Sequence, residues 1–332
     1  MLRMLVGRAF SALLVLLAVT FAVSAITKII PGDPVDVILV GNPGLSEEDM
    51  NRLRETLGLN KSVVEQFLSF TAKAVQGDFG RSIHQGMPNS QLIFERLPAT
   101  AELAFFAIVF ALLVAVPLGV ATAIRRNSAV DYFGTALAVF GVSVPGFLIG
   151  IFMITIFAVS LRWLPASGYR GSALMALWPA IASADPAVFW KAFRYFIMPA
   201  VSLSFVLVAV NTRLVRSGML EVLGQDFISF AFAKGIPPRI VYFKHALKNT
   251  LLPIVTVVGL QLGALFSGAI IIEEVFAWPG VGRLAVQAVA SRDYTLLQTI
   301  VLFAAILFVT LNIVVDLLYT WLDPRVKMGG RR

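Results

Sequence analysis

Six long segments of the chain contain no Lys, Arg, Asp or Glu, and this pattern restricts the fold more than any other feature of the sequence. A helix needs about 20 residues, at a rise of about 1.5 Å each, to cross a bilayer. Backbone polar groups in hydrocarbon must be hydrogen-bonded within the segment or in a closed barrel, so we expect each segment to be helical. The sequence therefore predicts an all-α integral membrane protein with six transmembrane helices, at residues 9–27, 103–124, 132–161, 195–212, 249–272 and 294–315.

Composition supports a membrane chain and excludes most kinds of catalytic site. Hydrophobic residues make up 58% of the chain and charged residues 14%, against about 45–50% and about 25% in soluble domains. The chain has no Cys, and its two His residues, His84 and His245, lie far apart. It also lacks the glycine-rich phosphate-binding loop of ATPases. We expect no catalytic residue, directly bound cofactor or metal ion, and we attribute the net charge of +8 to orientation in the membrane rather than to nucleic acid.

The distribution of charge predicts that both termini are cytoplasmic. With the N-terminus inside, 14 of the 19 acids fall outside, and 7 of the outer cations lie in one long stretch where charge has little influence on orientation. The first apolar segment is longer than the core of a signal peptide, about 7–15 residues, so we expect a retained anchor. This topology divides the chain into an anchor helix, an extracytoplasmic helical segment, a transmembrane core and a cytoplasmic tail, at residues 1–30, 31–96, 97–322 and 323–332.

The extracytoplasmic segment carries the signals of two short helices. Ser46 is a candidate N-cap of the first helix, which we expect to end at Gly58. Ser62 and Glu65 have the spacing of a capping box at the start of the second helix, and Gly77 marks its end. The outer segment is therefore expected to be helical although it does not cross the membrane.

The third apolar segment is too long for one straight span, and Pro145 and Gly146 inside it predict a kink or a change to a re-entrant helix. Glu273 and Glu274 close the fifth segment at its outer end, and Asp316 lies near the inner end of the sixth. For these acids we consider two interpretations, a hydrated or paired residue at a helix end and a gating or pathway role. The candidate gate or pathway residues are Pro145, Gly146, Glu273, Pro279 and Gly280.

Glycines recur at short intervals in the third and fifth apolar segments, and in lipid such spacing lets helix backbones approach closely. The residues are Gly146 and Gly150 in the third segment and Gly259, Gly263 and Gly268 in the fifth. The spacing alone leaves open whether they pack helices within one subunit or against a partner.

A basic stretch interrupted by proline, FAFAKGIPPRIVYFKHALKN from residue 230, lies in the longest predicted cytoplasmic segment, about residues 213–250. Asp226 is a candidate N-cap of a short helix through Lys234 that Gly235 ends. Pro237 or Pro238 then starts a second helix at its first turn.

The two predicted helices of this stretch differ in their apolar surfaces. In the second, Ile240, Phe243, Leu247 and Leu251 share one face. The first is apolar on most sides because it contains three phenylalanines. Such a helix outside the membrane indicates either docking into a hydrophobic groove of a partner protein or contact with anionic lipid, and the residues alone leave both open.

Several ordered motifs resemble the membrane-spanning subunits of binding-protein-dependent ABC importers, in the peptide and nickel branch, and most closely the first membrane subunit of dipeptide permeases. The stretch SGMLEVLGQDFISFAFAKG followed by HALKNTLLPIVT is similar to the cytoplasmic "EAA" loop of that branch. The other matching motifs are PGDP, LGL, GDFGRS and ERLPATAELA in the N-terminal half, and GAIIIEEVFAWPGVGRL, RDYTLLQ and DLLYTWLDPRV in the C-terminal half.

The resemblance implies a type-1 ABC importer transmembrane fold that works by alternating access in a bacterial inner membrane. The expected partners are a second homologous permease subunit, two ATP-binding subunits that hold ATP and magnesium, and an extracytoplasmic solute-binding protein. The cytoplasmic loop would dock on an ATPase, with the matching positions at Asp226, Ala231, Ala233, Lys234 and Gly235. Ser229, Phe230 and Phe232 depart from the usual pattern.

The resemblance further implies import of short peptides, without an enzymatic activity in this chain. Nickel, glutathione and oligosaccharide importers share the same motifs and are alternative substrate classes. An ion-coupled carrier or channel is the alternative of a different class, and the near absence of charge inside the spans argues against it.

Overall fold

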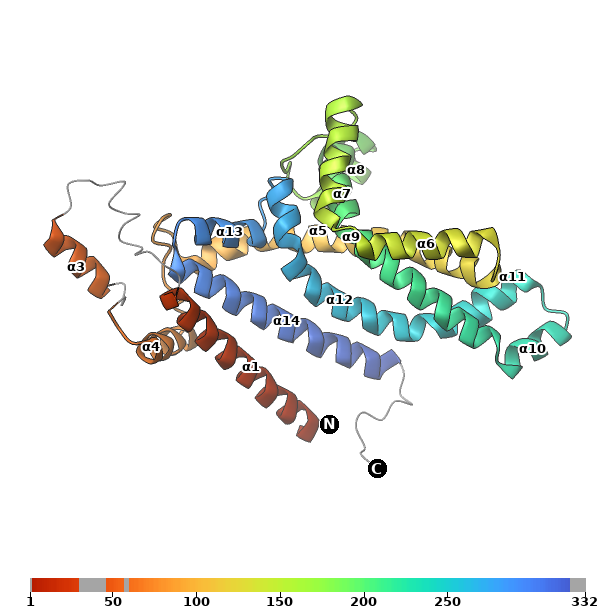
Figure 1. The fold of residues 1–332 in the computed structure, drawn as a ribbon, viewed down its shortest axis with the longest axis horizontal. Helices are drawn as coiled ribbons and strands as arrows, with labels where there is room; N and C mark the ends of the chain where they lie inside the picture. Colours follow the sequence, from red (N-terminus) through yellow and green to blue (C-terminus); the bar gives the residue numbers. More distant parts are fainter. Residues whose placement is uncertain (1, 30–45, 57–59, 323–332) are drawn as a thin grey trace. The chain divides into compact units, whose positions relative to one another are not determined.

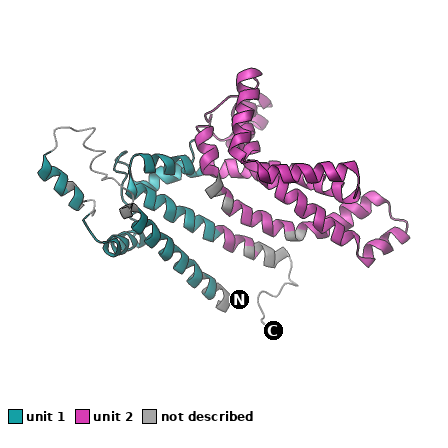
Figure 2. Cartoon of the chain, in the orientation of Figure 1, with its two compact units in different colours: residues 1–98, 279–310 teal, residues 99–278, 311–332 magenta. Residues whose placement is uncertain are grey.

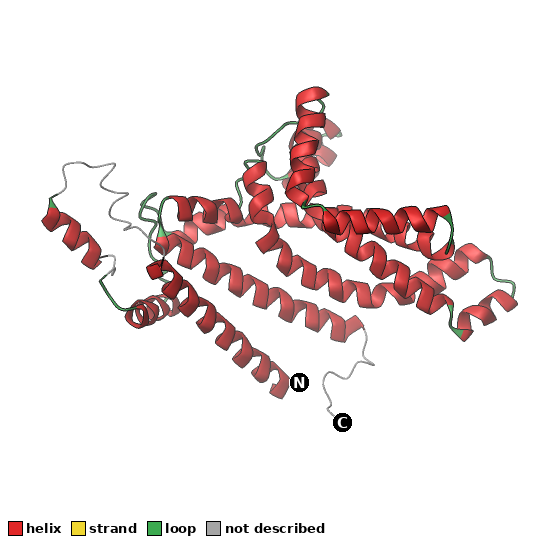
Figure 3. Cartoon of the chain, viewed as in Figure 1, coloured by secondary structure: helices red, strands yellow, loops and turns green. Residues whose placement is uncertain are grey.

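A computed structural model describes residues 2–29, 46–56 and 60–322 of the chain. Every regular element in these ranges is helical, and the only β-type pairing among them is an isolated bridge between Arg81 and Pro88. Figure 1 shows the helices coloured in the order of the sequence, and Figure 3 shows that helices make up most of the described chain. The prediction of an all-α fold is confirmed for the described residues. Gly58, the PGDP motif and the predicted tail lie outside them.

The helices fall into two compact groups of residues, which Figure 2 distinguishes by colour. Unit 1 comprises residues 1–98 and 279–310, and unit 2 comprises residues 99–278 and 311–332. The helices of the chain are α1 (Leu2–Ile29), α3 (Glu47–Thr56), α4 (Val63–Val75), α5 (Asn89–Ile124), α6 (Ala129–Ser143), α7 (Gly146–Met153), η1 (Ile154–Ser160), α8 (Ala173–Ala182), α9 (Pro186–Leu223), α10 (Asp226–Ala233), α11 (Pro238–Ile240), η2 (Val241–Ala246), α12 (Leu247–Val275), α13 (Val281–Ala290) and α14 (Tyr294–Leu322).

The short helices α3 and α4 of unit 1 begin where local signals predict. The Ser46 hydroxyl accepts a hydrogen bond from the Asp49 amide at 3.2 Å, which makes Ser46 the N-cap of α3. Ser62 and Glu65 form a complete capping box at α4, and Gly77 follows the helix with φ +84°. Both N-cap predictions are therefore confirmed, because capping depends only on residues three apart in sequence.

A loop of unit 1, residues 77–88, is fixed to the start of α14 by hydrogen bonds between residues about 210 positions apart. The Asp293 carboxylate accepts from the Ser82 hydroxyl at 2.5 Å and from the Leu296 amide at 3.1 Å, so it caps α14 and holds the loop at once. Thr299 donates to the Phe79 carbonyl at 2.9 Å. The Asn89 side-chain amide donates to the same carbonyl at 2.9 Å and to the Thr299 hydroxyl at 3.2 Å. The GDFGRS and RDYTLLQ motifs are thus two halves of one structural element.

Helix α9 is the helix on which unit 2 packs, and small residues bring its neighbours close to it. A Cβ atom added at Gly119 of α5 would lie 2.6 Å from Val215 Cβ, and one at Gly141 of α6 would lie 2.7 Å from Ala209 Cβ. Closer to the middle of α9, a Cβ at Gly146 would lie 2.8 Å from the Ser202 carbonyl oxygen. Helix–helix association in lipid depends on such close contact, because apolar side chains gain little by leaving a lipid environment.

The glycine pattern of the third and fifth apolar segments acts within the subunit. A Cβ at Gly150 would lie 2.9 Å from the Phe276 ring, and one at Gly259 would overlap with the Val315 side chain. These positions together with Gly146 pack against other helices of the same chain. Of the two interpretations left open by the sequence, packing within one subunit is therefore confirmed for these three glycines.

An ion pair joins α6 to α9. The Arg216 guanidinium donates from Nε to Asp131 Oδ1 at 2.6 Å and from Nη2 to Oδ2 at 2.9 Å. The Asn127 amide adds a third hydrogen bond to the carboxylate at 3.0 Å. Asp131 is buried, and a bidentate pair with further donors is the geometry that compensates a carboxylate for its loss of water.

The third apolar segment is broken at Pro145. Helix α6 ends at Ser143, α7 begins at Gly146, and the two pieces are bent by 99°. The predicted break at Pro145 and Gly146 is confirmed. Among the described residues, three helices are long and apolar enough to span a membrane, or up to five if each bent pair counts as one span. The count of six stays a prediction.

We expect Gly119→Leu to destabilise the protein, because the new side chain has no space between α5 and α9. Overpacking a close contact costs about 1–3 kcal/mol. The measurement is the thermal unfolding midpoint of the protein in detergent. Gly7→Leu is the control, since no atom lies within 4 Å of its Cβ position. Equal midpoints for the two variants would contradict the close packing on α9.

Candidate functional site

The segment between α9 and α12 forms two short helical pieces, the first α10 and the second α11 continued by η2. Figure 1 shows α10 and α11 at the ends of the two long helices. Gln225 is the N-cap residue of α10, with extended backbone angles and no side-chain cap. Asp226 is the first helical residue, so the prediction that Asp226 is the N-cap is wrong by one position. Its carboxylate still lies in the first turn, where the helix dipole favours negative charge.

Helix α10 ends at Gly235 as the sequence predicts. The amide of Gly235 donates to the Phe232 carbonyl at 2.9 Å, and the amide of Ile236 donates to the Ala231 carbonyl at 3.3 Å. These two bonds are those of a Schellman motif, in which the residue after the C-cap adopts a left-handed conformation. Gly235 has φ +74°, which a residue with a Cβ adopts only with strain.

One side of α10 is anchored in the protein. Ile228 and Ala231 are buried and pack in a cluster with α5 and α9 that includes Val120, Val215 and Met219. This anchoring fixes the position of the helix relative to α9, because the packed side chains leave little freedom to slide. A displacement of α10 would therefore be transmitted to α9.

The opposite side of α10 is apolar and exposed. Phe230 is 61% exposed, and Phe227 and Phe232 are also exposed. The Lys234 ammonium lies 4.7 Å from the centre of the Phe230 ring, a cation–π contact at the surface. An apolar surface with one cation is suited to a protein partner or to anionic lipid, the two interpretations that the sequence left open.

The second piece does not have the apolar face that the sequence predicts. Residues Val241–Ala246 form a π-helical turn, η2, in which Val241 and Ala246 are buried in the same cluster as α10. Ile240 is exposed and Phe243 is 57% exposed, whereas Leu247 and Leu251 are partly buried against the cluster, so the four residues predicted to share one face do not share one environment. The wider turn changes the spacing of residues that share a face, and the prediction assumed an α-helical period.

The five residues predicted for docking lie within the same short stretch, but they do not share one environment. Asp226, Ala233, Lys234 and Gly235 are exposed. Ala231 is buried against the protein itself. In this structure Ala231 therefore supports the helix and does not present a side chain at its surface.

The candidate gate residues of unit 2 lie at packed helix junctions. Pro145 is the N-cap of α7, and Gly146 contacts α9 as described above. Glu273 is 0% exposed and accepts a hydrogen bond from the Thr100 hydroxyl at 2.6 Å. It is therefore a paired residue near a helix end and not a hydrated one. Pro279 and Gly280 belong to unit 1, where Gly280 is the N-cap of α13.

An aromatic cluster beside Glu273 was not predicted from the sequence. The ring of Trp278 is fully buried, 4.5 Å from that of Phe196 and 4.9 Å from that of Tyr169, and its Nε1 donates to the Ala99 carbonyl at 3.0 Å. Burial and the nearby Glu102 carboxylate raise the pKa of the Tyr169 phenol. Phe196 and Tyr169 are far from Trp278 in sequence, so their contact could not be predicted. The two neighbouring aromatics of VFAWPG, Phe276 and Trp278, were the one feature of the sequence that indicated an aromatic cluster here.

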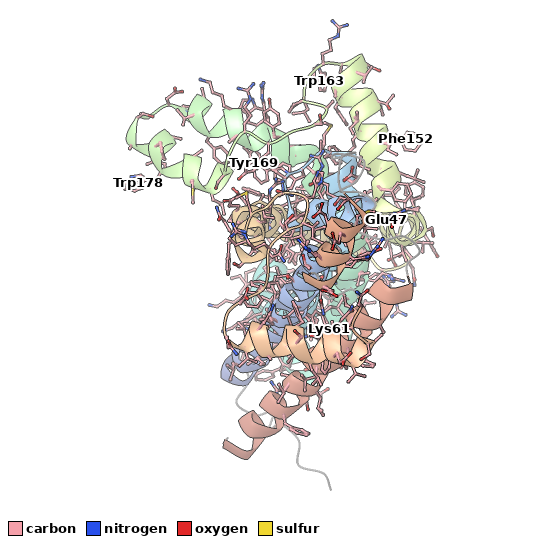
Figure 4. The ribbon with its side chains drawn as sticks, turned by 90° about the vertical axis from the view of Figure 1, so that its left-hand side faces the viewer. Glu47, Lys61, Phe152, Trp163, Tyr169 and Trp178 are labelled. Atoms are coloured by element: carbon pink, nitrogen blue, oxygen red, sulfur yellow. The ribbon has the colours of Figure 1, made fainter. Side chains whose placement is uncertain are left out.

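The same region carries aromatic and apolar side chains that point outward. Figure 4 labels Phe152 on α7, Trp163 after η1 and Trp178 on α8, and all three are exposed. Exposed Trp is typical of the boundary between lipid and water. In the described ranges no group of three or more His, Cys, Asp or Glu residues is arranged to hold a metal ion.

Comparison with known families and structures gives consistent matches over most of the chain. The family model described as binding-protein-dependent transport system inner membrane component matches residues 115–328, and the model of the N-terminal part of such components matches residues 1–104. An inward-facing structure of the MetNI methionine ABC transporter is 18% identical, with a TM-score of 0.56, and covers 70% of this chain and 97% of its own. That likeness concerns the fold alone.

Curated relatives match nearly the full length. The dipeptide transport system permease protein DppB of Alkalihalophilus pseudofirmus is 38% identical over 94% of this chain and 96% of its own. The probable D,D-dipeptide transport system permease protein DdpB of Escherichia coli is 36% identical over 97% of both chains. The oligopeptide transport system permease protein AppB of Bacillus subtilis is 35% identical over 97% of this chain and 98% of its own.

We expect Gly235→Ala to loosen the end of α10 through backbone strain alone, because no atom lies within 4 Å of its Cβ position. A left-handed conformation costs about 1–2 kcal/mol in a residue with a Cβ, which corresponds to about 5- to 30-fold faster amide exchange of residues 234–236. Gly224→Ala is the control, because Gly224 has φ −82°. Unchanged hydrogen–deuterium exchange in Gly235→Ala would contradict the Schellman assignment.

Proposed function

The chain belongs to the family of binding-protein-dependent transport system inner membrane components, and we propose that it forms, with a second homologous permease, the pathway by which an ABC importer takes up short peptides. It is a multi-pass membrane permease subunit with the importer fold. The peptide assignment is supported by relatives named as dipeptide and oligopeptide permeases that match 94–97% of the chain. This full-length match to peptide permeases is the observation that carries the proposal.

In this proposal α10 is the site where ATP hydrolysis in a partner acts on the chain. The exposed side of α10 offers Phe230, Phe232 and Lys234 to a cleft of the ATPase, and Asp226, Ala233 and Gly235 border that surface. The buried side, at Ile228 and Ala231, passes the movement to α9. Because α9 also packs on α6, α7 and α12, a shift of α10 would move these helices together as rigid bodies.

The other subunits of the proposed importer follow from the same assignment to the family. Two ATP-binding subunits hold ATP and magnesium, so this chain carries no catalytic residue and binds no cofactor itself. An extracytoplasmic solute-binding protein delivers the peptide to the outer face. The complex lies in the plasma membrane of a bacterium, the inner membrane where there are two, with both termini of this chain in the cytoplasm. Pro145, Gly146, Glu273, Pro279 and Gly280 remain candidate gate or pathway residues.

The proposal predicts ATP-driven uptake of a labelled dipeptide by vesicles that contain the complete complex and its binding protein. Vanadate should abolish the uptake, because it arrests the ATPase cycle, and a protonophore should leave it unchanged. Nickel, glutathione and an oligosaccharide serve as competing substrates. Uptake that collapses with the proton gradient would indicate an ion-coupled carrier, and competition by one of the other substrates would reassign the substrate class.

We expect Gly235→Asp to abolish uptake while the protein remains in the membrane, because the variant places a carboxylate in the docking surface. Gly235→Asn is the matched control, since Asn has nearly the same shape, tolerates positive φ and carries no charge. Uptake and membrane content are measured in the same preparation. Normal transport by Gly235→Asp would contradict the coupling role of α10, and equal loss in both variants would assign the effect to the backbone.

A further inference from the structure

Two amide side chains face each other between α9 and α12, deep in the apolar part of unit 2. Asn211 Nδ2 donates to Gln261 Oε1 at 2.9 Å and to the Leu207 carbonyl at 2.8 Å. Asn211 is fully buried, and Gln261 is half-buried. Polar side chains inside a spanning segment are costly and mark functional positions.

The pair has hydrogen-bonding capacity that the interface between the two helices does not use. Both protons of the Asn211 amide are engaged, and its Oδ1, which is shielded from solvent in this conformation, has no hydrogen-bond partner in the described part of the chain. Gln261 Oε1 is engaged as an acceptor, its amide nitrogen carries two further protons, and the residue is half-buried. One interhelical hydrogen bond would be enough to fasten the helices, so the unused acceptor and donors need a different explanation.

The depth of the pair in the membrane agrees with a binding role. Gln261 lies 12 residues after Asn249 and 11 before Ile272, the ends of the fifth apolar segment, so it is about 18 Å from the inner end of that segment at a rise of about 1.5 Å per residue. Helix α9 runs alongside, with Gly218 close to Thr250 and Asn211 at Gln261. In secondary transporters the substrate sites lie near the midplane of the bilayer, and an importer that also works by alternating access has the same geometric need.

We propose that Asn211 and Gln261 form a subsite in the translocation pathway that binds a main-chain amide of the transported peptide. A peptide group offers one N–H donor and one carbonyl acceptor, which match the free acceptor of Asn211 and the free donors of Gln261. The subsite carries no charge, so it recognises the feature that all peptides share and is indifferent to their side chains. The inference rests on the proposed import of peptides and assigns two residues to it.

The absence of cysteine from the chain gives a direct test. Gln261→Cys introduces a single thiol at the subsite, and its modification by a membrane-impermeant methanethiosulfonate is followed on this chain in the assembled complex. A transported dipeptide should slow the reaction about 5-fold or more, because a bound ligand is mostly enclosed by its site. Lys61→Cys is the control. Lys61 is exposed in the segment predicted to be extracytoplasmic, so the reagent reaches it and its modification should not depend on the peptide.

A second variant covers the case in which the cysteine variant fails to assemble. Gln261→Leu keeps most of the volume and removes the amide. The readout is the ratio of uptake of a dipeptide to uptake of its ester analogue, which lacks the N–H, with the affinity of the binding protein for both ligands measured separately. We expect the preference of the wild type for the amide, after correction for the binding protein, to fall about 5- to 10-fold, since a site built for a hydrogen bond rejects a ligand that lacks it.

Equal modification rates of Gln261→Cys with and without peptide, or an unchanged uptake ratio in Gln261→Leu, would overturn the subsite. These results are distinct from failure of the proposed function, because in that case the wild-type complex takes up no dipeptide. A purely structural role of the pair would lower the amount of assembled complex and leave the ratio unchanged, and this outcome also overturns the proposal.

Discussion

Close backbone contact along α9 is the constraint on which unit 2 depends. In lipid the hydrophobic effect between helices is weak, so association requires short distances that permit dispersion contacts and interhelical hydrogen bonds. Gly119, Gly141 and Gly146 provide these distances on three neighbouring helices, and the Asp131–Arg216 pair adds a fixed polar link. Once α9 is surrounded in this way, it cannot move without its neighbours. Rigidity of the bundle and transmission of force are therefore consequences of the same packing.

Helix α10 extends this packing to the surface of the bundle. Its buried side is part of the cluster formed with α5 and α9, and its exposed side carries the phenylalanines. The π-helical turn η2 completes the connection, because its unusual spacing buries both Val241 and Ala246 in that cluster. The helices that flank α10 and η2, which are α9 and α12, are thus both attached to one small core. A force applied to α10 reaches α9 directly and α12 through η2.

Local signals in the sequence predicted local structure well. The capping box of Ser62 and Glu65, the end of α10 at Gly235 and the break at Pro145 depend on a few adjacent residues, and the structure contains all three. The N-cap of α10 was misplaced by one residue because Gln225 takes the extended conformation although Asp226 has the better capping side chain.

Features that depend on distant residues were not predictable in the same way. Ile240 and Phe243 do not share an environment with Leu247 and Leu251, because the π-helical turn between them changes the α-helical spacing from which a common face was predicted. Glu273 could be identified as unusual, but its partner Thr100 lies 173 residues away. The Asn211–Gln261 pair gave no signal, because single amides in apolar segments have no periodicity.

The loop of residues 77–88 in unit 1 has a consequence for how the chain is made. Its hydrogen-bond partners, Asp293, Thr295 and Thr299, are synthesised more than 200 residues later. Ribosomes deliver the N-terminal part of a protein first, so this loop cannot form these hydrogen bonds until residues 293–299 have been made. Helix α14, whose start carries the partners, then completes unit 1. A chain truncated before residue 293 would leave the loop of residues 77–88 without these hydrogen bonds, even if all the segments between were folded.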